Sequence, residues 1–141
     1  MKIKITRLID KPIIPALLTQ EIGSNVQGPS LIKSPIWLSK PLGKYYLYFA
    51  DHKGDRIKLA YSDKLIGPWK IYSGGTLELK DSYFLTEVPE TPKDFDLNSL
   101  KPREAHPELI KHIPKKIDDL TLPHIASPDV HIDESNEKII M

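Results

Sequence analysis

The sequence predicts an all-β protein, and three observations lead to this expectation. First, residues 28–75 divide into four short apolar or alternating segments joined by tight turns. Second, all seven glycines lie at or before Gly75, so glycine-containing turns are confined to that part of the chain. Third, strand-like patterning returns in residues 124–141, after a stretch rich in proline and charged residues.

Each of the four segments fits a β-strand. The first is the apolar pair Leu31-Ile32, and the second, residues 44–50, is dense in aromatic residues, which is typical of a buried strand. Residues 56–62 alternate polar and apolar side chains, as a half-buried strand does, and residues 69–72 form a short outer strand. Consecutive strands joined by tight turns predict one antiparallel sheet. Such a sheet is the unit of a β-propeller blade, and an isolated meander fits the same pattern.

The rest of the chain divides into three parts. Residues 1–27 contain two prolines and are expected to be extended and irregular. Residues 76–123 read as a Pro-rich insertion with one short helix from His106 to His112. Residues 124–141 read as two extended segments around a turn, which predicts two further strands.

Composition and charge exclude several classes of protein. With 40% hydrophobic and 28% charged residues, the 141-residue chain has the balance of a globular domain and not of a disordered segment. Its 20 basic and 19 acidic residues give a net charge of +1, so we expect no nucleic-acid partner and no attraction to anionic lipid. No apolar run approaches the roughly 20 residues that span a bilayer, so no membrane partner is expected.

Redox, metal and targeting signals are absent from the sequence. Without cysteine the chain has no disulfide, thiolate metal site or cysteine nucleophile. No motif supplies the three or more ligands that a metal site needs, so we expect no metal and no cofactor. Asp10, Lys11 and Pro12 interrupt the apolar residues near the N-terminus, so no signal peptide is expected and a cytoplasmic location is favoured.

Several motifs resemble the family 43-type glycoside hydrolases. "GPSLI" from Gly28, "GKYYLYFA" from Gly43, "LAYSD" from Leu59 and "GPW" from Gly67 resemble the first blade of that family in content and order. "HIASPDV" from His124 resembles the start of its second blade.

The resemblance covers residues 25–75 and 124–141 and implies a fold with domain boundaries. The expected fold is a partial five-bladed β-propeller with a Pro-rich, partly helical insertion. Residues 1–141 form one incomplete propeller domain, in which 28–75 are blade one, 76–123 the insertion and 124–141 the start of blade two. The chain is therefore expected to be an N-terminal, truncated fragment of a longer protein.

The resemblance also implies a catalytic set of three carboxylates: a base, a supporting aspartate and a glutamate acid. The base normally stands in an Asp-Pro pair, and Gly28 occupies its place here. Asp129, after Pro128, matches the supporting aspartate, and the glutamate is expected beyond Met141. One of the three carboxylates is present, so the chain is expected to be inactive by itself.

Four further residues are candidates for this site. Asp51 and His52 follow an inner strand and are candidate catalytic residues, although a hairpin turn alone explains the pair. His124 and His131 flank Asp129 and are candidates for substrate binding. Asp129 and His131 are two residues apart, which puts both side chains on the same face of a strand.

The predicted function is that of a glycoside hydrolase-like protein acting on oligosaccharide or polysaccharide. The alternative is a non-catalytic carbohydrate-binding or assembly module, since Gly28 replaces the base while aromatic residues remain, with Trp37 as the candidate stacking platform. A third interpretation is a truncated product that folds poorly, with residues 138–141 as an unpaired apolar edge. The expected partners are a carbohydrate and other copies of the chain, joined through incomplete propeller edges.

Overall fold

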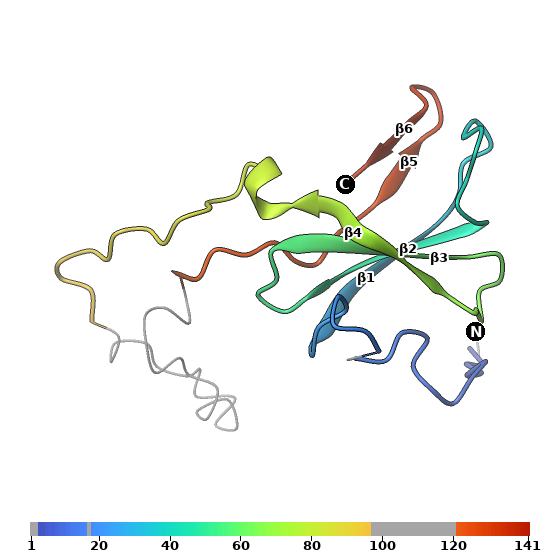
Figure 1. Cartoon of the computed structure of the whole chain (residues 1–141), viewed down its shortest axis with the longest axis horizontal. Helices are drawn as coiled ribbons and strands as arrows, with labels where there is room; N and C mark the ends of the chain where they lie inside the picture. The colour runs from blue at the N-terminus through green and yellow to red at the C-terminus, as the bar shows by residue number, and fades with distance from the viewer. Residues whose placement is uncertain (1–2, 17, 97–120) are drawn as a thin grey trace.

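A four-stranded antiparallel sheet dominates the computed structural model, which describes residues 3–16, 18–96 and 121–141 (Figure 1). The strand order is β1-β2-β3-β4, and β5 and β6 pair in a separate hairpin. A single 3-10 turn, η1, follows β4 within the described residues. The elements are β1 (Val26–Lys33), β2 (Tyr45–Asp51), β3 (Arg56–Ser62), β4 (Lys70–Glu78), η1 (Leu79–Asp81), β5 (His131–Asp133) and β6 (Lys138–Ile140).

The four consecutive strands predicted in residues 28–75 are confirmed in order and in antiparallel pairing. The first and last are longer than predicted, because bulges let the pairing continue past residues that interrupt a regular ladder. In β1 the register shifts between Gln27 and Ser30, which accommodates Gly28-Pro29. Opposite β4 it shifts between Ile57 and Leu59, so the strand continues through its two glycines to Glu78.

Each face of the sheet carries an apolar cluster, because successive side chains of β2 point to opposite sides. Tyr46 and Tyr48 belong to the core cluster on one face. Leu47 and Phe49 point to the other face, where Phe49 packs with the fully buried Ile22 from the loop before β1. The N-terminal loop (residues 18–25) therefore covers one face of the sheet.

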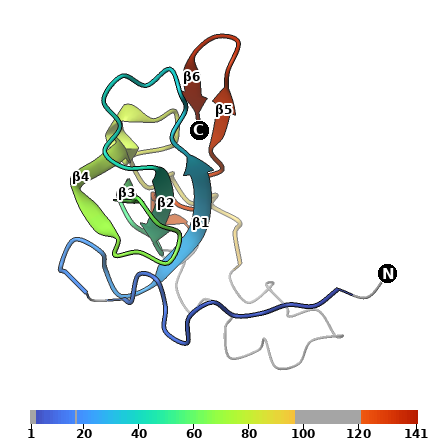
Figure 2. The ribbon, with the colours of Figure 1, turned by 90° about the vertical axis from the view of Figure 1, so that its right-hand side faces the viewer.

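The predicted fold class, a partial five-bladed β-propeller with a partly helical insertion, is wrong. The described residues form one sheet of four strands and one hairpin of two. Ile125 and Val130 are buried in the same cluster as Tyr46 and Tyr48, and the Ile125 N–H donates to the Gly54 carbonyl at 2.9 Å. Ile125 and Val130 of the C-terminal segment thus complete the core of the four-stranded sheet, and the β5–β6 hairpin stands at one end of it (Figures 1 and 2).

The helical part of that prediction also fails in the described residues. Residues 82–96 leave the sheet as a chain without strands or helices (Figure 1). Pro89 and Pro92 explain this, since each lacks a backbone donor and disfavours helix at the residue before it. The helix predicted from His106 to His112 lies outside the described residues. Within the described ranges, no helix has the length and apolar character needed to cross a bilayer.

The turn of the β5–β6 hairpin is held by the Asp133 carboxylate. It accepts hydrogen bonds from the Asn136 side chain (2.7 Å), the Ser135 hydroxyl (2.9 Å) and the Asn136 N–H (3.1 Å). These bonds, that of the Asn136 side chain foremost, hold the pKa of Asp133 below its ordinary value of 3.8. A depressed carboxyl pKa stabilises the folded turn above the unfolded pKa, and this contribution is lost as the pH falls through the folded pKa.

We therefore expect the hairpin to loosen as the pH falls below about 4. Cross-strand NMR contacts between Ile132 and Ile139, which face each other in the register, should weaken over that range. The Asp133→Asn variant has no titrating group at this position, so its hairpin should not loosen over this pH range. An identical acid transition in both proteins would contradict the assignment to Asp133.

Candidate functional site

Gly28 of β1 meets Ser127 of the C-terminal segment backbone to backbone. Both residues have left-handed conformations, with φ of 60° and 55°. A Cβ added to Gly28 would lie 2.3 Å from the Ser127 Cα, too close for any real side chain. Glycine is thus required here both by its φ and by the close approach. The family resemblance expects a catalytic aspartate at this position, and the contact leaves no room for its side chain.

Beyond Ser127 the chain is held against β1 by Val130. Its N–H donates to the Ser30 hydroxyl at 2.9 Å, and its side chain is buried in the core. Because side chains alternate along an extended segment, the inward Val130 directs its neighbours Asp129 and His131 outward. The structure thereby brings together two of the predicted site residues.

The Asp129 and His131 side chains contact each other on the surface. The His131 Nε2 lies 3.0 Å from an Asp129 carboxylate oxygen, and the two side chains are 69% and 83% exposed respectively. Exposed pairs of this kind contribute little to stability. The pair instead presents a carboxylate acceptor and an imidazole ring to solvent on a backbone segment anchored in the core. The left-handed Ser127 beside it is an uncommon conformation of the kind that clusters at functional sites.

Asp51 and His52 contact the loop before β1. The Asp51 carboxylate accepts a hydrogen bond from the Asn25 N–H at 2.7 Å, and its Cγ would lie 2.4 Å from a Cβ added to Gly23. His52 is exposed, with its Nδ1 3.3 Å from the Gln27 Nε2. Asp51 therefore secures the N-terminal loop, and its partners differ from those of the Asp129–His131 pair.

The other two residues that were predicted to bind substrate are His124 and Trp37. His124 is exposed, and its Nδ1 lies 2.8 Å from the Leu122 carbonyl oxygen. Trp37 is half-buried, and its indole nitrogen is buried with no hydrogen-bond partner among the described residues. The polar edge of the Trp37 ring is therefore not presented to solvent.

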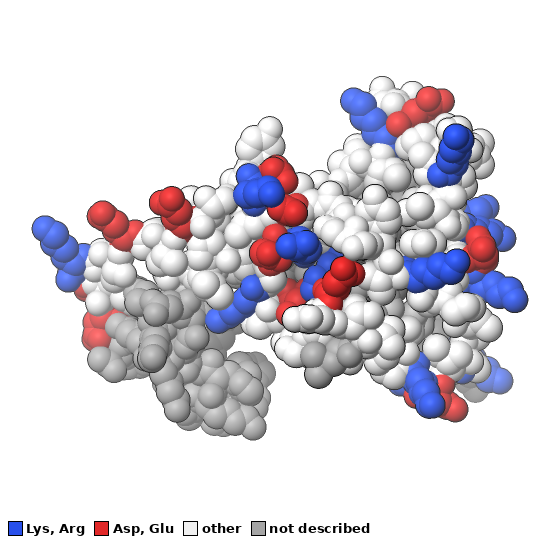
Figure 3. Space-filling view, viewed as in Figure 1, with Lys and Arg blue, Asp and Glu red and all other residues white. Residues whose placement is uncertain are grey.

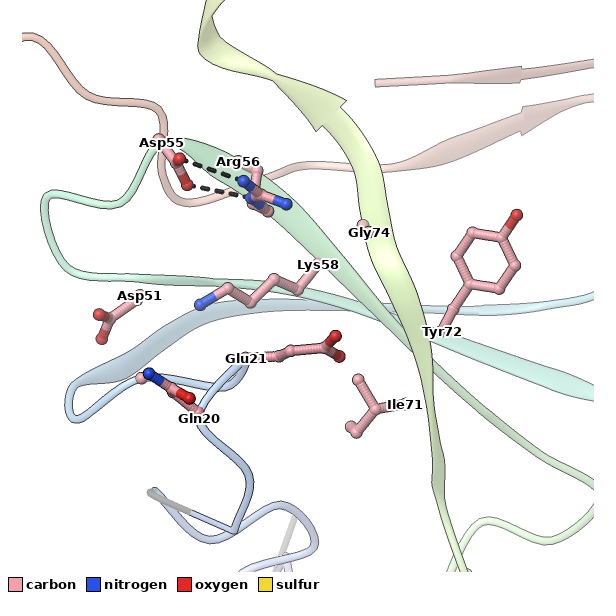
Figure 4. Close-up of a pocket in the computed structure, with 11 residues that line it drawn as sticks. Gln20, Glu21, Asp51, Asp55, Arg56, Lys58, Ile71, Tyr72 and Gly74 are labelled. Atoms are coloured by element: carbon pink, nitrogen blue, oxygen red, sulfur yellow. Dashed lines mark hydrogen bonds and ion pairs between the residues drawn. The ribbon is translucent and has the colours of Figure 1, made fainter.

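A polar hollow that the sequence did not indicate opens between the N-terminal loop and strands β3 and β4 (Figure 4). Its volume is about 370 Å³. Of its lining residues only Asp51 was a candidate from the sequence. The one available signal was the pair of basic residues, Arg56 and Lys58, on the polar positions of β3. The lining residues are Gln20, Glu21, Gly23, Asp51, Asp55, Arg56, Lys58, Ile71, Tyr72, Gly74 and Gly75.

The surface charge is mixed on the face seen in Figure 3. Lysine and arginine side chains lie among aspartate and glutamate side chains, with no broad region of one sign on that face (Figure 3). Within the described ranges, no three histidine, aspartate or glutamate side chains come together in a way that could hold a metal ion.

Comparison with known proteins gives one distant relative. A protein of Acanthamoeba polyphaga mimivirus, described only as uncharacterized, is 29% identical over 134 residues, which cover 88% of this chain and 29% of the relative. The chain thus spans less than a third of the relative's length. No protein-family model matches the chain, and no solved structure shows significant similarity to it.

Proposed function

We propose that this chain is the saccharide-contacting part of a glycoside hydrolase-like protein that acts on oligosaccharide or polysaccharide. The observation that carries the proposal is the Asp129–His131 pair, exposed at 3.0 Å on a segment whose backbone is fixed by Ser30 and Val130. The same segment carries the "SPDV" sequence on which the resemblance to family 43-type enzymes rests.

The chemistry of the pair suits a sugar. A hydroxyl group is both a donor and an acceptor, so it can donate to the Asp129 carboxylate while a neighbouring hydroxyl bonds the His131 ring. Because the backbone that carries both side chains is anchored by Val130, a ligand that binds them does not have to order this segment.

Hydrolysis needs a second carboxyl group across the glycosidic bond. The position that the resemblance assigns to the base is Gly28, whose contact with Ser127 excludes a side chain. We therefore expect this chain by itself to bind saccharide without cleaving it.

That same contact favours a second candidate function, a non-catalytic carbohydrate-binding or assembly module. The two functions differ in whether the complete protein cleaves the sugar that this chain binds. A cytoplasmic location and self-association, which was predicted through incomplete propeller edges, stay predictions.

Binding of neutral oligosaccharides tests the proposal. We expect titration calorimetry with xylo- and cello-oligosaccharides to give binding that Asp129→Ala weakens by about tenfold or more, since a hydrogen bond to a charged group contributes about 1.5–3 kcal/mol. Glu134→Ala removes the same charge from the exposed hairpin turn and serves as the matched control.

Two results would contradict the proposal. One is the absence of binding to every oligosaccharide tested, which would remove the saccharide-contacting role. The other is an equal loss of affinity in Asp129→Ala and Glu134→Ala, which would remove the site. Cleavage of an oligosaccharide by this chain, abolished in Asp129→Ala, would restore a hydrolytic role in place of binding alone.

A further inference from the structure

We propose that the hollow between the N-terminal loop and strands β3 and β4 is a second saccharide subsite, shaped for a neutral mono- or disaccharide. This inference rests on the proposed function for the class of ligand, but it concerns different residues from the Asp129–His131 pair. The volume of about 370 Å³ lies at the small end of the roughly 300–1,000 Å³ of ligand pockets.

Two oppositely charged side chains cross the hollow from facing walls. Glu21 extends from the N-terminal loop toward β4, and Lys58 extends from β3 toward that loop (Figure 4). Glu21 accepts a hydrogen bond from the Ser73 hydroxyl at 3.1 Å, and the Lys58 Nζ donates to the Ile22 carbonyl at 2.9 Å. Each side chain is therefore anchored before any ligand arrives, as preorganised binding groups are.

Partial burial distinguishes Lys58 from an ordinary surface lysine. Desolvation lowers the pKa of its ammonium group, while the nearby Asp51 carboxylate acts in the opposite direction. A partly desolvated ammonium has fewer water partners and retains further N–H donors beyond the one used on Ile22. Sugar hydroxyls are suitable acceptors for those donors.

The charges lining the hollow nearly cancel, which favours a neutral ligand. There are three carboxylates, from Glu21, Asp51 and Asp55, and two cations, from Arg56 and Lys58. Asp55 and Arg56 also pair with each other through two hydrogen bonds of 3.1 and 3.2 Å. Both acceptors and donors therefore line the space, and a ligand with many hydroxyl groups can use both.

The β4 side of the hollow supplies apolar surface and space. Ile71 forms part of this wall, whereas the ring of the neighbouring Tyr72 points away from the hollow on the other side of β4, so Tyr72 contributes only its backbone (Figure 4). Gly74 has no neighbouring atoms within 4 Å of the place where a Cβ would stand. The apolar C–H face of a sugar ring can pack against Ile71, and the open space at Gly74 leaves room for its hydroxyl groups.

NMR titration with cellobiose, maltose and xylobiose tests the subsite. We expect shifts of the Ile71, Tyr72 and Gly74 backbone amides on addition of at least one of the three disaccharides. Glu21→Ala should weaken that binding by at least about tenfold, and Glu134→Ala should leave it unchanged. Arg56→Gln tests the opposite wall if Glu21→Ala fails to fold, and thermal melting shows which variants are folded.

The outcomes separate this subsite from the proposed function. Shifts at β4 that survive Asp129→Ala but not Glu21→Ala would establish a second, independent subsite. Shifts confined to residues 127–131, or binding unaffected by Glu21→Ala and Arg56→Gln, would overturn the subsite and leave the proposed function intact. No shift at Tyr72 and Gly74 with any disaccharide would also overturn it, whatever binds at Asp129. Tighter binding of glucuronic acid than of the neutral sugars would contradict the neutral ligand class.

Discussion

Replacing Gly28 with aspartate is expected to destabilise the protein by about 2–5 kcal/mol. A left-handed backbone costs a non-glycine residue about 1–2 kcal/mol, and forcing extra atoms into a filled space costs about 1–3 kcal/mol. Both apply here, since Gly28 has a φ of 60° and its Cβ would lie 2.3 Å from the Ser127 Cα. Urea unfolding of the two proteins measures the difference.

Gly74→Asp is the matched control for this variant. Gly74 also has a positive φ, of 84°, but a Cβ there would meet nothing within 4 Å. We expect it to lose only the backbone part, about 1–2 kcal/mol. Equal stability of Gly28→Asp and Gly74→Asp would show that the contact with Ser127 is not tight. A stable Gly28→Asp variant would also reopen the possibility of a carboxylate at the position where the family resemblance expects the base.

Phe49→Ala is expected to lower the free energy of unfolding by about 3–5 kcal/mol. Phe49 lies in the middle of β2 with 1% of its surface exposed, and it packs with Ile22 and Ala60. Its removal leaves a cavity between the sheet and the N-terminal loop. Because whole domains are stable by only about 5–15 kcal/mol, we expect a large fall in the urea midpoint or outright unfolding.

Phe84→Ala is the control for the truncation of Phe49. Phe84 lies in the segment after η1 and is 65% exposed, so its loss should change stability by about 0.5 kcal/mol or less. Similar effects of the two truncations would mean that the face of the sheet under the N-terminal loop is not a packed core.

The two faces of the sheet show which features the local sequence pattern predicts and which it does not. Because side chains alternate along a strand, Tyr46 and Tyr48 share a face opposite Leu47, and the core clusters have that arrangement. The sequence did not predict which segments cover each face, since Ile22 and Val130 come from distant parts of the chain. The predicted propeller failed at this step, because Ile125 and Val130, which were assigned to a second blade, are buried in the core of the first sheet.

The candidate site also has one part that the sequence predicted and one part that it did not. That Asp129 and His131 share a face followed from their spacing alone, and the 3.0 Å contact between the two side chains agrees with it. The hollow was missed because its two anchored side chains, Glu21 and Lys58, belong to segments far apart in the sequence, and only the folded N-terminal loop brings them to the same hollow.

By itself, then, the sequence determined the strands of residues 28–75, their order and the direction of their side chains, since these depend on neighbours in the chain. Only the tertiary structure decided that Gly28 lies against Ser127, that the C-terminal segment completes the first core and that a polar hollow opens beside β4. The Val130–Ser30 hydrogen bond joins residues 100 positions apart. Contacts at such separations are set by packing and by backbone hydrogen bonding across the whole molecule, and no local pattern encodes them.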